Sequence, residues 1–139
     1  MKYISGLVML FVVVAVFTGC QNKKVEVPVQ SYSLRSVYFD YDDSLIRGDA
    51  STAMQGNASY LKQNPNVMVT IEGNCDNRGT NEYNLALGHR RAQASKGYIM
   101  NLGVSDSRMS TVSYGEERPV CHQYTEECWQ RNRRADFRK

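Results

Sequence analysis

The chain has 139 residues, which is enough for one domain of ordinary size and a short additional segment. Hydrophobic residues make up 42% of it and charged residues 22%, values that are typical of a globular protein and exclude a disordered one. The formal net charge of +3 is too small to indicate a protein that binds nucleic acid.

The first residues have the pattern of an export signal. Lys2 gives a positive start, and residues 7–17 form an apolar run that is shorter than the roughly 20 residues needed to span a bilayer. Thr18 and Gly19 then precede Cys20, and small residues before a cysteine resemble a lipobox. The resemblance implies a lipoprotein signal peptide over residues 1–19 and a covalent lipid on Cys20. An uncleaved membrane anchor is the alternative.

A linker follows the cysteine. Residues 21–33 are polar or β-branched, contain Pro28 and show no helical periodicity. Extended at about 3.3 Å per residue, they reach roughly 40 Å. We therefore expect a lipidated flexible tether over residues 20–33 and a folded domain over residues 34–139. By the sorting rules of enteric bacteria, Gln21 rather than Asp after the cysteine implies an outer-membrane destination.

The rest of the chain predicts strands and helices in the order β-α-β-α-β-α-β, with a short last helix. Alternating apolar residues indicate the strands, and a period of 3.6 residues with Gly or Pro stops indicates the helices. The sequence therefore predicts an α+β fold with two main helices packed on a mixed four-stranded sheet. The predicted strands are residues 36–41, 67–72, 108–114 and 134–137, and the predicted helices are residues 47–63, 81–102 and 126–132.

The long helix over residues 81–102 carries an arginine on its apolar side. On a helical wheel Arg91 falls inside the apolar arc, whereas Arg90 falls at the polar margin. A buried guanidinium is costly unless a partner satisfies it, so either a structural ion pair or an anion-binding site would explain Arg91. The predicted arc consists of Tyr83, Leu85, Leu87, Ala92, Ala94, Tyr98, Ile99 and Leu102.

The loop before this helix offers an acidic group. Asp76 lies in a turn between Gly73 and Gly79, and such loops present binding residues from a rigid scaffold. If Asp76 and Arg91 face each other across a pocket, they suit a zwitterion, whose ammonium would meet the carboxylate and whose carboxylate would meet the guanidinium.

The same region contains two spaced motifs. N-x2-L-x3-R-A is formed by Asn84, Leu87, Arg91 and Ala92, and D-x-R-G begins at Asp76. With these motifs, residues 71–92 resemble the OmpA-like peptidoglycan-binding domain, and especially its Pal (peptidoglycan-associated lipoprotein) branch. Further landmarks of the branch occur in order, namely VYFDYD at 37–42, SYGEERP at 113–119 and NRR at 132–134.

This resemblance implies an OmpA-like fold that binds the diaminopimelate residue of the peptidoglycan stem peptide without covalent bonds. Asp76 would hold the ligand ammonium and Arg91 its carboxylate, while backbone and loop groups line the ligand. A lysine in place of diaminopimelate lacks that carboxylate and would leave Arg91 unpaired. The residues implied in peptidoglycan binding are Asp76, Arg91, Phe39, Asp40, Asn74 and Asn84.

The resemblance further implies an outer-membrane lipoprotein that faces the periplasm and anchors the membrane to the cell wall. It would act in the Tol-Pal system of cell division, with TolB and other Tol proteins as partners and with no cofactor apart from the lipid. Another OmpA-domain lipoprotein, serving motility, secretion or adhesion, is the alternative.

The remaining cysteines do not indicate catalysis. Cys121 and Cys128 enclose a short polar segment in an oxidising compartment, which favours a disulfide; a zinc site that includes His122 is the alternative. Cys75 is expected to be a buried or half-buried thiol without chemistry. No histidine or cysteine has a convincing catalytic partner, so we expect no enzyme and reject a peptidoglycan hydrolase.

Two charged groups remain. Arg78 and Glu82 are interpreted as residues that stabilise the loop, with direct contact to the ligand as the alternative. The basic C-terminal run is interpreted as a solvated edge, with a contact surface as the alternative. This run consists of Arg131, Arg133, Arg134, Arg138 and Lys139.

Overall fold

The computed structural model describes residues 33–139. The predicted signal peptide, Cys20 and the tether up to residue 32 lie outside the described residues. The elements are β1 (Val37–Tyr38), a 3₁₀ turn (Gly48–Ala50), α1 (Ser51–Gln63), β2 (Val69–Asn74), α2 (Asn81–Asn101), a second 3₁₀ turn (Asp106–Arg108), β3 (Met109–Gly115), α3 (Glu126–Asn132) and β4 (Arg134–Arg138).

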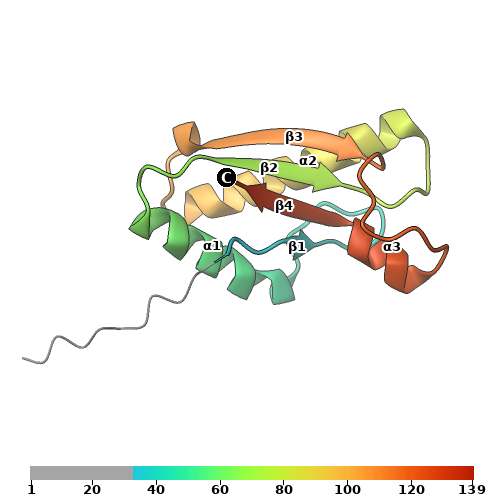
Figure 1. Cartoon of the computed structure of the whole chain (residues 1–139), viewed down its shortest axis with the longest axis horizontal. Coiled ribbons are helices and arrows are strands. Elements are labelled where there is room, and N and C mark those ends of the chain that lie inside the picture. The colour runs from blue at the N-terminus through green and yellow to red at the C-terminus, as the bar shows by residue number, and fades with distance from the viewer. Residues whose placement is uncertain (1–32) are drawn as a thin grey trace, which may run out of the picture. The chain divides into compact units, whose positions relative to one another are not determined.

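The four strands form one mixed sheet in the order β1-β4-β2-β3 (Figure 1). β4 pairs antiparallel with both β1 and β2, whereas β2 and β3 are parallel. Parallel neighbours need a crossover connection, and α2 provides it. The predicted fold class and order of elements are therefore confirmed.

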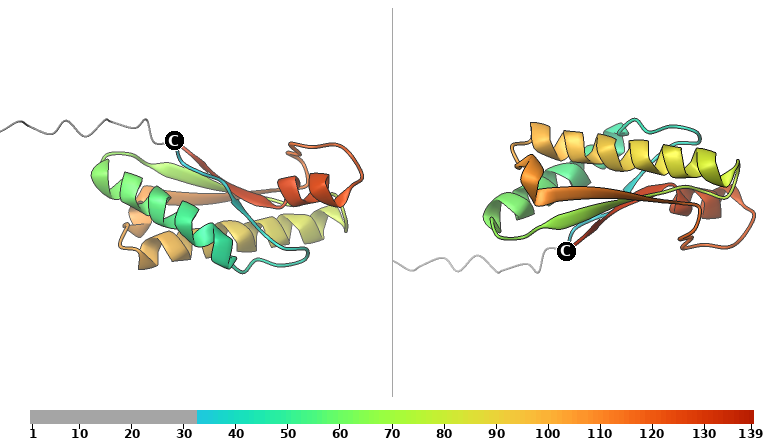
Figure 2. Two further views of the ribbon diagram at one scale, coloured as in Figure 1. Left: turned by 90° about the horizontal axis from the view of Figure 1, so that it is seen from below. Right: turned by 90° about the horizontal axis from the view of Figure 1, so that it is seen from above.

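The core lies between this sheet and two helices, because both views of Figure 2 show α1 and α2 on the same side of the strands. Val69 and Ile71 on β2 alternate with Thr70 and Glu72, and only the first pair is buried. The buried apolar core consists of Val37, Phe39, Ala50, Met54, Ala58, Leu61, Val69, Ile71, Ala92, Ile99, Val104, Met109, Ala135 and Phe137.

The first strand is shorter than predicted. Its pairing with β4 ends at Tyr38, and the chain then turns through Asp42, whose φ of 52° lies in the left-handed region. Just before the strand, the buried side chain of Asn57 on α1 clamps the backbone of Arg35. It accepts from the Arg35 N–H at 2.8 Å and donates to the Arg35 carbonyl at 2.8 Å.

The buried face of α2 differs from the predicted arc. Tyr83 and Leu85 are 45% and 40% exposed, so their assignment to the buried face is wrong. Asn84, Gly88 and Ser95 are buried instead. The helix packs against the sheet through small and polar residues, and periodicity of hydrophobic residues cannot detect such a face.

A contact between two glycines explains this packing. Gly73 on β2 and Gly88 on α2 bring their backbones together, and a Cβ placed on Gly73 would lie 1.8 Å from the Gly88 carbonyl oxygen. A Cβ on Gly88 would in turn lie 2.3 Å from Oγ of Ser113 on β3. The close approach fixes the position of α2 over the end of β2.

Substitution of these glycines tests the contact. We expect Gly73→Ala to lower the free energy of unfolding by about 3 kcal/mol or more, because the added methyl group meets backbone that cannot move aside. Gly97→Ala on the same helix is the matched control, since nothing lies within 4 Å of its Cβ position. That change should raise stability by about 0.5–1 kcal/mol in urea unfolding. Similar effects of the two changes would contradict the contact.

Candidate functional site

The candidate site lies at the end of the sheet where β2 stops and α2 begins, close to α3 (Figure 1). The register between β2 and β3 shifts at Gly73 and Asn74, an irregularity that re-aims the residues after it. The backbone N–H of Cys75 then bonds to the Gly115 carbonyl at 2.7 Å. A cavity of about 110 Å³ opens here, lined by Tyr41, Asp42, Cys75, Asp76, Arg78, Gly79, Tyr83, Asn84, Leu87 and Arg91.

Asp76 is the buried acid of the cavity, with an exposed fraction of 4%. Its Oδ1 accepts the backbone N–H of Arg78 at 3.1 Å and the Arg78 Nε at 3.2 Å. Its Oδ2 accepts Nη2 of Arg78 at 2.7 Å and Nη1 of Arg133 at 3.1 Å. Two guanidinium groups therefore hold one carboxylate.

These contacts keep Asp76 ionised. Burial alone would raise its pKa, but the hydrogen bonds from Arg78 and Arg133 outweigh burial and hold the pKa below the ordinary value. The carboxylate is therefore negatively charged at neutral pH and below.

Arg91 is fully buried and is held by neutral groups. Its Nε donates to the Asp43 carbonyl at 2.8 Å and its Nη2 to the Asp40 carbonyl at 3.0 Å. Nη1 donates to the Asn74 carbonyl at 2.9 Å and to Sγ of Cys75 at 3.3 Å. Arg91 makes no ion pair with a carboxylate in the described part of the chain, so the structural ion pair left open by the helical wheel is not formed there.

Arg91 is thus fixed in place without a carboxylate in direct contact among residues 33–139, although the nearby charges of Asp76 and Asp43 favour its protonated form. A guanidinium carries two N–H groups on each η nitrogen and one on Nε, so one N–H on Nη2 has no acceptor among residues 33–139. The thiol of Cys75 is a weak acceptor that a carboxylate could replace. Burial lowers the pKa of Arg91, yet an arginine stays protonated at neutral pH.

The structure separates the other predicted site residues into two kinds. Asn84 lines the cavity, and its Nδ2 donates to the carbonyls of Asp76 and Arg78, each at 3.3 Å. Phe39, Asp40 and Asn74 do not line it. Their backbone carbonyls instead accept hydrogen bonds from the buried arginines. The Phe39 carbonyl accepts one from Nε of Arg133 at 3.1 Å, and the carbonyls of Asp40 and Asn74 accept hydrogen bonds from Arg91.

Sequence reasoning missed the role of the basic C-terminal run. Arg133 and Arg134 are buried, so the interpretation of these two residues as a solvated edge is wrong. Arg134 pairs with Asp136 at 3.0 Å, and Arg133 reaches Asp76. Alternation offered only a partial signal: it places Arg134 and Asp136 on one strand face, where they can pair, but Arg133 precedes β4 and its contact with Asp76 leaves no local pattern.

Arg78 was interpreted as stabilising the loop, and its contacts support that interpretation. Its guanidinium carbon lies 4.1 Å from the ring centroid of Tyr41 and 4.1 Å from that of Trp129. Nη1 also lies 3.6 Å from Oε2 of Glu126. Glu82, in the first turn of α2, is exposed and suits the positive end of the helix dipole.

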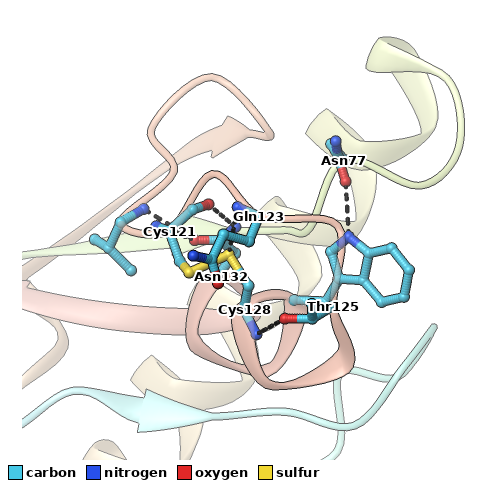
Figure 3. The surroundings of a disulfide bond; sticks show 8 residues. Asn77, Cys121, Gln123, Thr125, Cys128 and Asn132 are labelled. Atoms are coloured by element: carbon cyan, nitrogen blue, oxygen red, sulfur yellow. Dashed lines mark hydrogen bonds between the residues drawn. A yellow bond between two sulfur atoms is a disulfide. The ribbon is translucent and has the colours of Figure 1, made fainter.

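The predicted disulfide is confirmed, since Cys121 and Cys128 are joined (Figure 3). The zinc alternative at these cysteines is thereby excluded. The Asn132 side chain accepts the Cys121 N–H at 3.1 Å and donates to its carbonyl at 2.8 Å. On the loop after β2, Asn77 accepts Nε1 of Trp129 at 3.0 Å. The linked loop and α3 therefore pack against the candidate site.

Cys75 is a free, buried thiol as predicted. Burial raises its pKa to about 11, against the opposing effect of Arg91, so it is protonated at neutral pH. Within residues 33–139, no cluster of three or more His, Cys, Asp or Glu side chains could hold a metal ion. The helices described there are also too short or too polar to cross a membrane.

The depressed pKa of Asp76 gives a prediction for stability against pH. Its folded-state pKa lies below the unfolded value of about 3.9, so its stabilising effect is complete above that value and is lost as the pH falls through the folded pKa. We expect Asp76→Asn to lower the free energy of unfolding by about 3 kcal/mol at pH 7, because Arg133 loses its buried partner. In urea unfolding, the difference in free energy of unfolding between the unmodified chain and the Asp76→Asn variant should stay constant down to about pH 5 and shrink below about pH 4. A pH-independent difference would contradict the ion-pair cluster.

Comparison with known proteins identifies the family. The OmpA family matches residues 38–133. The peptidoglycan-associated lipoprotein of Brucella melitensis is 50% identical over 99 residues, which cover 71% of this chain and 59% of that protein. The protein of the same name from Pseudomonas putida is 43% identical over 122 residues, covering 88% and 73%. The match thus spans less than two thirds of the Brucella relative.

Solved structures agree with the sequence comparison. The crystal structure of the peptidoglycan-associated lipoprotein from Burkholderia pseudomallei superimposes with a TM-score of 0.73 at 46% identity, covering 75% of this chain and 88% of that one. The C-terminal domain of Helicobacter pylori MotB gives 0.69 at 19% identity, covering 76% and 83%, and at that identity shares the fold alone. On these grounds the chain belongs to the OmpA family and groups with its peptidoglycan-associated lipoproteins.

Proposed function

We propose that this chain is an outer-membrane lipoprotein that binds peptidoglycan through the diaminopimelate residue of the stem peptide. The observation that carries the proposal is that Asp76 and Arg91, a buried carboxylate and a buried guanidinium, line one cavity. In this proposal the ligand ammonium meets Asp76 and the ligand carboxylate meets Arg91.

The carboxylate half of the site supports this choice of ligand. Arg91 is surrounded by carbonyl dipoles that orient it, so a ligand carboxylate would supply a negative charge in direct contact with it. It would accept the remaining N–H of Nη2 and could replace the weak sulfur contact on Nη1. Charge-assisted hydrogen bonds of this kind contribute roughly 1.5–3 kcal/mol each.

The same geometry favours diaminopimelate over lysine. A lysine side chain offers an ammonium for Asp76 but no carboxylate for Arg91. The buried guanidinium would then stay unpaired beside a bound cation, and a site built from buried polar groups rejects such an analogue strongly. We expect no turnover of either ligand, and the proposed role is binding alone.

The names of the relatives support the cellular role. Proteins called peptidoglycan-associated lipoprotein align with this chain at 43–50% identity, and we extend wall association and the lipoprotein character to it. Cys20 would carry the lipid, and the domain would face the periplasm. The lipid would hold one end of the chain in the outer membrane, and the domain would bind the wall reversibly at the other end. Many such weak binding events on one membrane would together anchor it through multivalency.

We further propose a place in the Tol-Pal system of cell division, with TolB as the protein partner. A lipoprotein of motility, secretion or adhesion is the competing proposal, and the likeness to MotB at 19% identity supports it through the fold alone. Co-purification of TolB with the full chain from its own envelope would favour the first proposal. Absence of TolB, alongside recovered peptidoglycan, would favour the second.

Binding of wall fragments tests the main proposal. We expect Arg91→Gln to weaken binding of a diaminopimelate-type muropeptide by about 100-fold, since it removes a buried charge that pairs with the ligand. Calorimetry of the full chain in detergent measures the affinity, and a lysine-type muropeptide should bind the unmodified chain far more weakly.

Arg90→Gln is the matched control. Arg90 is the exposed neighbour on α2 and stacks 5.8 Å above the Tyr83 ring without lining the cavity. The Arg90→Gln variant should bind the diaminopimelate-type muropeptide nearly as tightly as the unmodified chain does. Equal losses in the two variants, or equal affinity for the two muropeptides, would contradict the proposed recognition.

A further inference from the structure

The ammonium half of the cavity is already occupied by a side chain of the protein. Asp76 accepts two hydrogen bonds on each carboxylate oxygen, three of them from Arg78 and one from Arg133. A carboxylate offers about four lone-pair sites, so no site remains for a ligand ammonium. A ligand that uses Asp76 must therefore displace a donor that is already there.

We propose that Arg78 is an internal stand-in for the ligand ammonium, which leaves Asp76 when the ligand enters. This inference rests on the proposed function and specifies how its cation subsite operates. It makes binding at Asp76 an exchange of one cation for another.

The contacts of the two arginines decide which of them moves. The Arg133 side chain is 3% exposed and is held by the Phe39 carbonyl, Gln130 and Glu126 in addition to Asp76. The Arg78 side chain is 29% exposed and lines the cavity. Arg133 is therefore the fixed partner of Asp76, and Arg78 is the exchangeable one.

Arg78 also has interactions that survive its release from Asp76. Its guanidinium lies between the rings of Tyr41 and Trp129 and near Glu126, which is itself exposed. Cation–π contacts and an ion pair at the surface can hold the displaced group, so the movement needs only a change in side-chain torsion angles.

Charge balance gives the exchange its driving force. Arg78 and Arg133 place two positive charges directly on Asp76, while Glu126 accepts both arginines at its exposed carboxylate. Arg91 and the carboxylate of Asp42 also line the cavity. If Arg78 stayed in place, a ligand ammonium would be the third cation on the Asp76 carboxylate, after Arg78 and Arg133. Withdrawal of Arg78 toward Glu126 removes that repulsion and leaves Asp76 shared by Arg133 and the ligand.

The single tryptophan of the chain reports this movement. Three tripeptides, L-Ala-γ-D-Glu-X, would be titrated into the unmodified full chain in detergent. In the first peptide X is meso-diaminopimelate. In the second X is 2-aminopimelate, which keeps the distal carboxylate but lacks the distal amine. In the third X is lysine, which keeps the amine but lacks the distal carboxylate. We expect diaminopimelate to change Trp129 emission in a saturable way as Arg78 moves on its ring. Calorimetry should show that the aminopimelate peptide binds, but this peptide should leave Trp129 emission unchanged. The lysine peptide should change the emission only at far higher concentration.

A variant provides the second arm. Arg78→Met keeps a long side chain between the two rings but removes the competing cation, so the diaminopimelate peptide should bind at least threefold more tightly and Trp129 should respond little. Arg118→Met is the matched control, because Arg118 also stacks on a ring, 3.4 Å from the Tyr114 centroid, and does not line the cavity. It should leave affinity and emission change as in the unmodified chain.

The outcomes separate this inference from the function on which it rests. If the unmodified chain binds the diaminopimelate peptide but the amine-free peptide gives the same emission change, the exchange is wrong and the function stands. Unchanged or weaker binding by a folded Arg78→Met variant overturns it as well. If the unmodified chain binds none of the peptides, the proposed function itself fails.

Discussion

The structure depends on one buried guanidinium that backbone carbonyls hold in place. Arg91 comes from the middle of α2, and its acceptors belong to two other segments, at Asp40 and Asp43 after β1 and at Asn74 at the end of β2. A buried positive charge without these dipoles would be too costly to keep. Because the dipoles orient it and no carboxylate among residues 33–139 contacts it, Arg91 ties three segments together and also keeps an attraction for an anion.

Much of this arrangement could be predicted from the sequence. Periodicity gave the order of all the main elements, and Arg91 stood out because a charge interrupted an apolar stripe. The predicted arc failed at Tyr83 and Leu85 because α2 packs through Gly88, and a close backbone contact leaves no hydrophobic signal. The function of Asp76 was inferred from a local loop motif, but its link to Arg133 spans 57 residues and depends on tertiary structure.

The same limit applies to the aromatic part of the site. Arg78 has a local partner in Asp76, whereas the rings of Tyr41 and Trp129 come from distant parts of the chain. The disulfide was predictable from spacing and compartment. That it links the loop before α3 to Cys128 within this helix, next to the candidate site, was visible only in three dimensions.

The short first strand has a mechanical consequence. In a chain tethered at its N-terminus and gripped by a ligand at Arg91, tension enters near residue 35 and passes along the backbone to Asp40 and Asp43, whose carbonyls hold that arginine. The Asn57 clamp on Arg35 and the two-residue pairing of β1 with β4 resist the pull first. Under the proposed function, the path from membrane to ligand would therefore begin along the edge of the sheet, and Arg91 would pass part of the load to Asn74 at the end of β2.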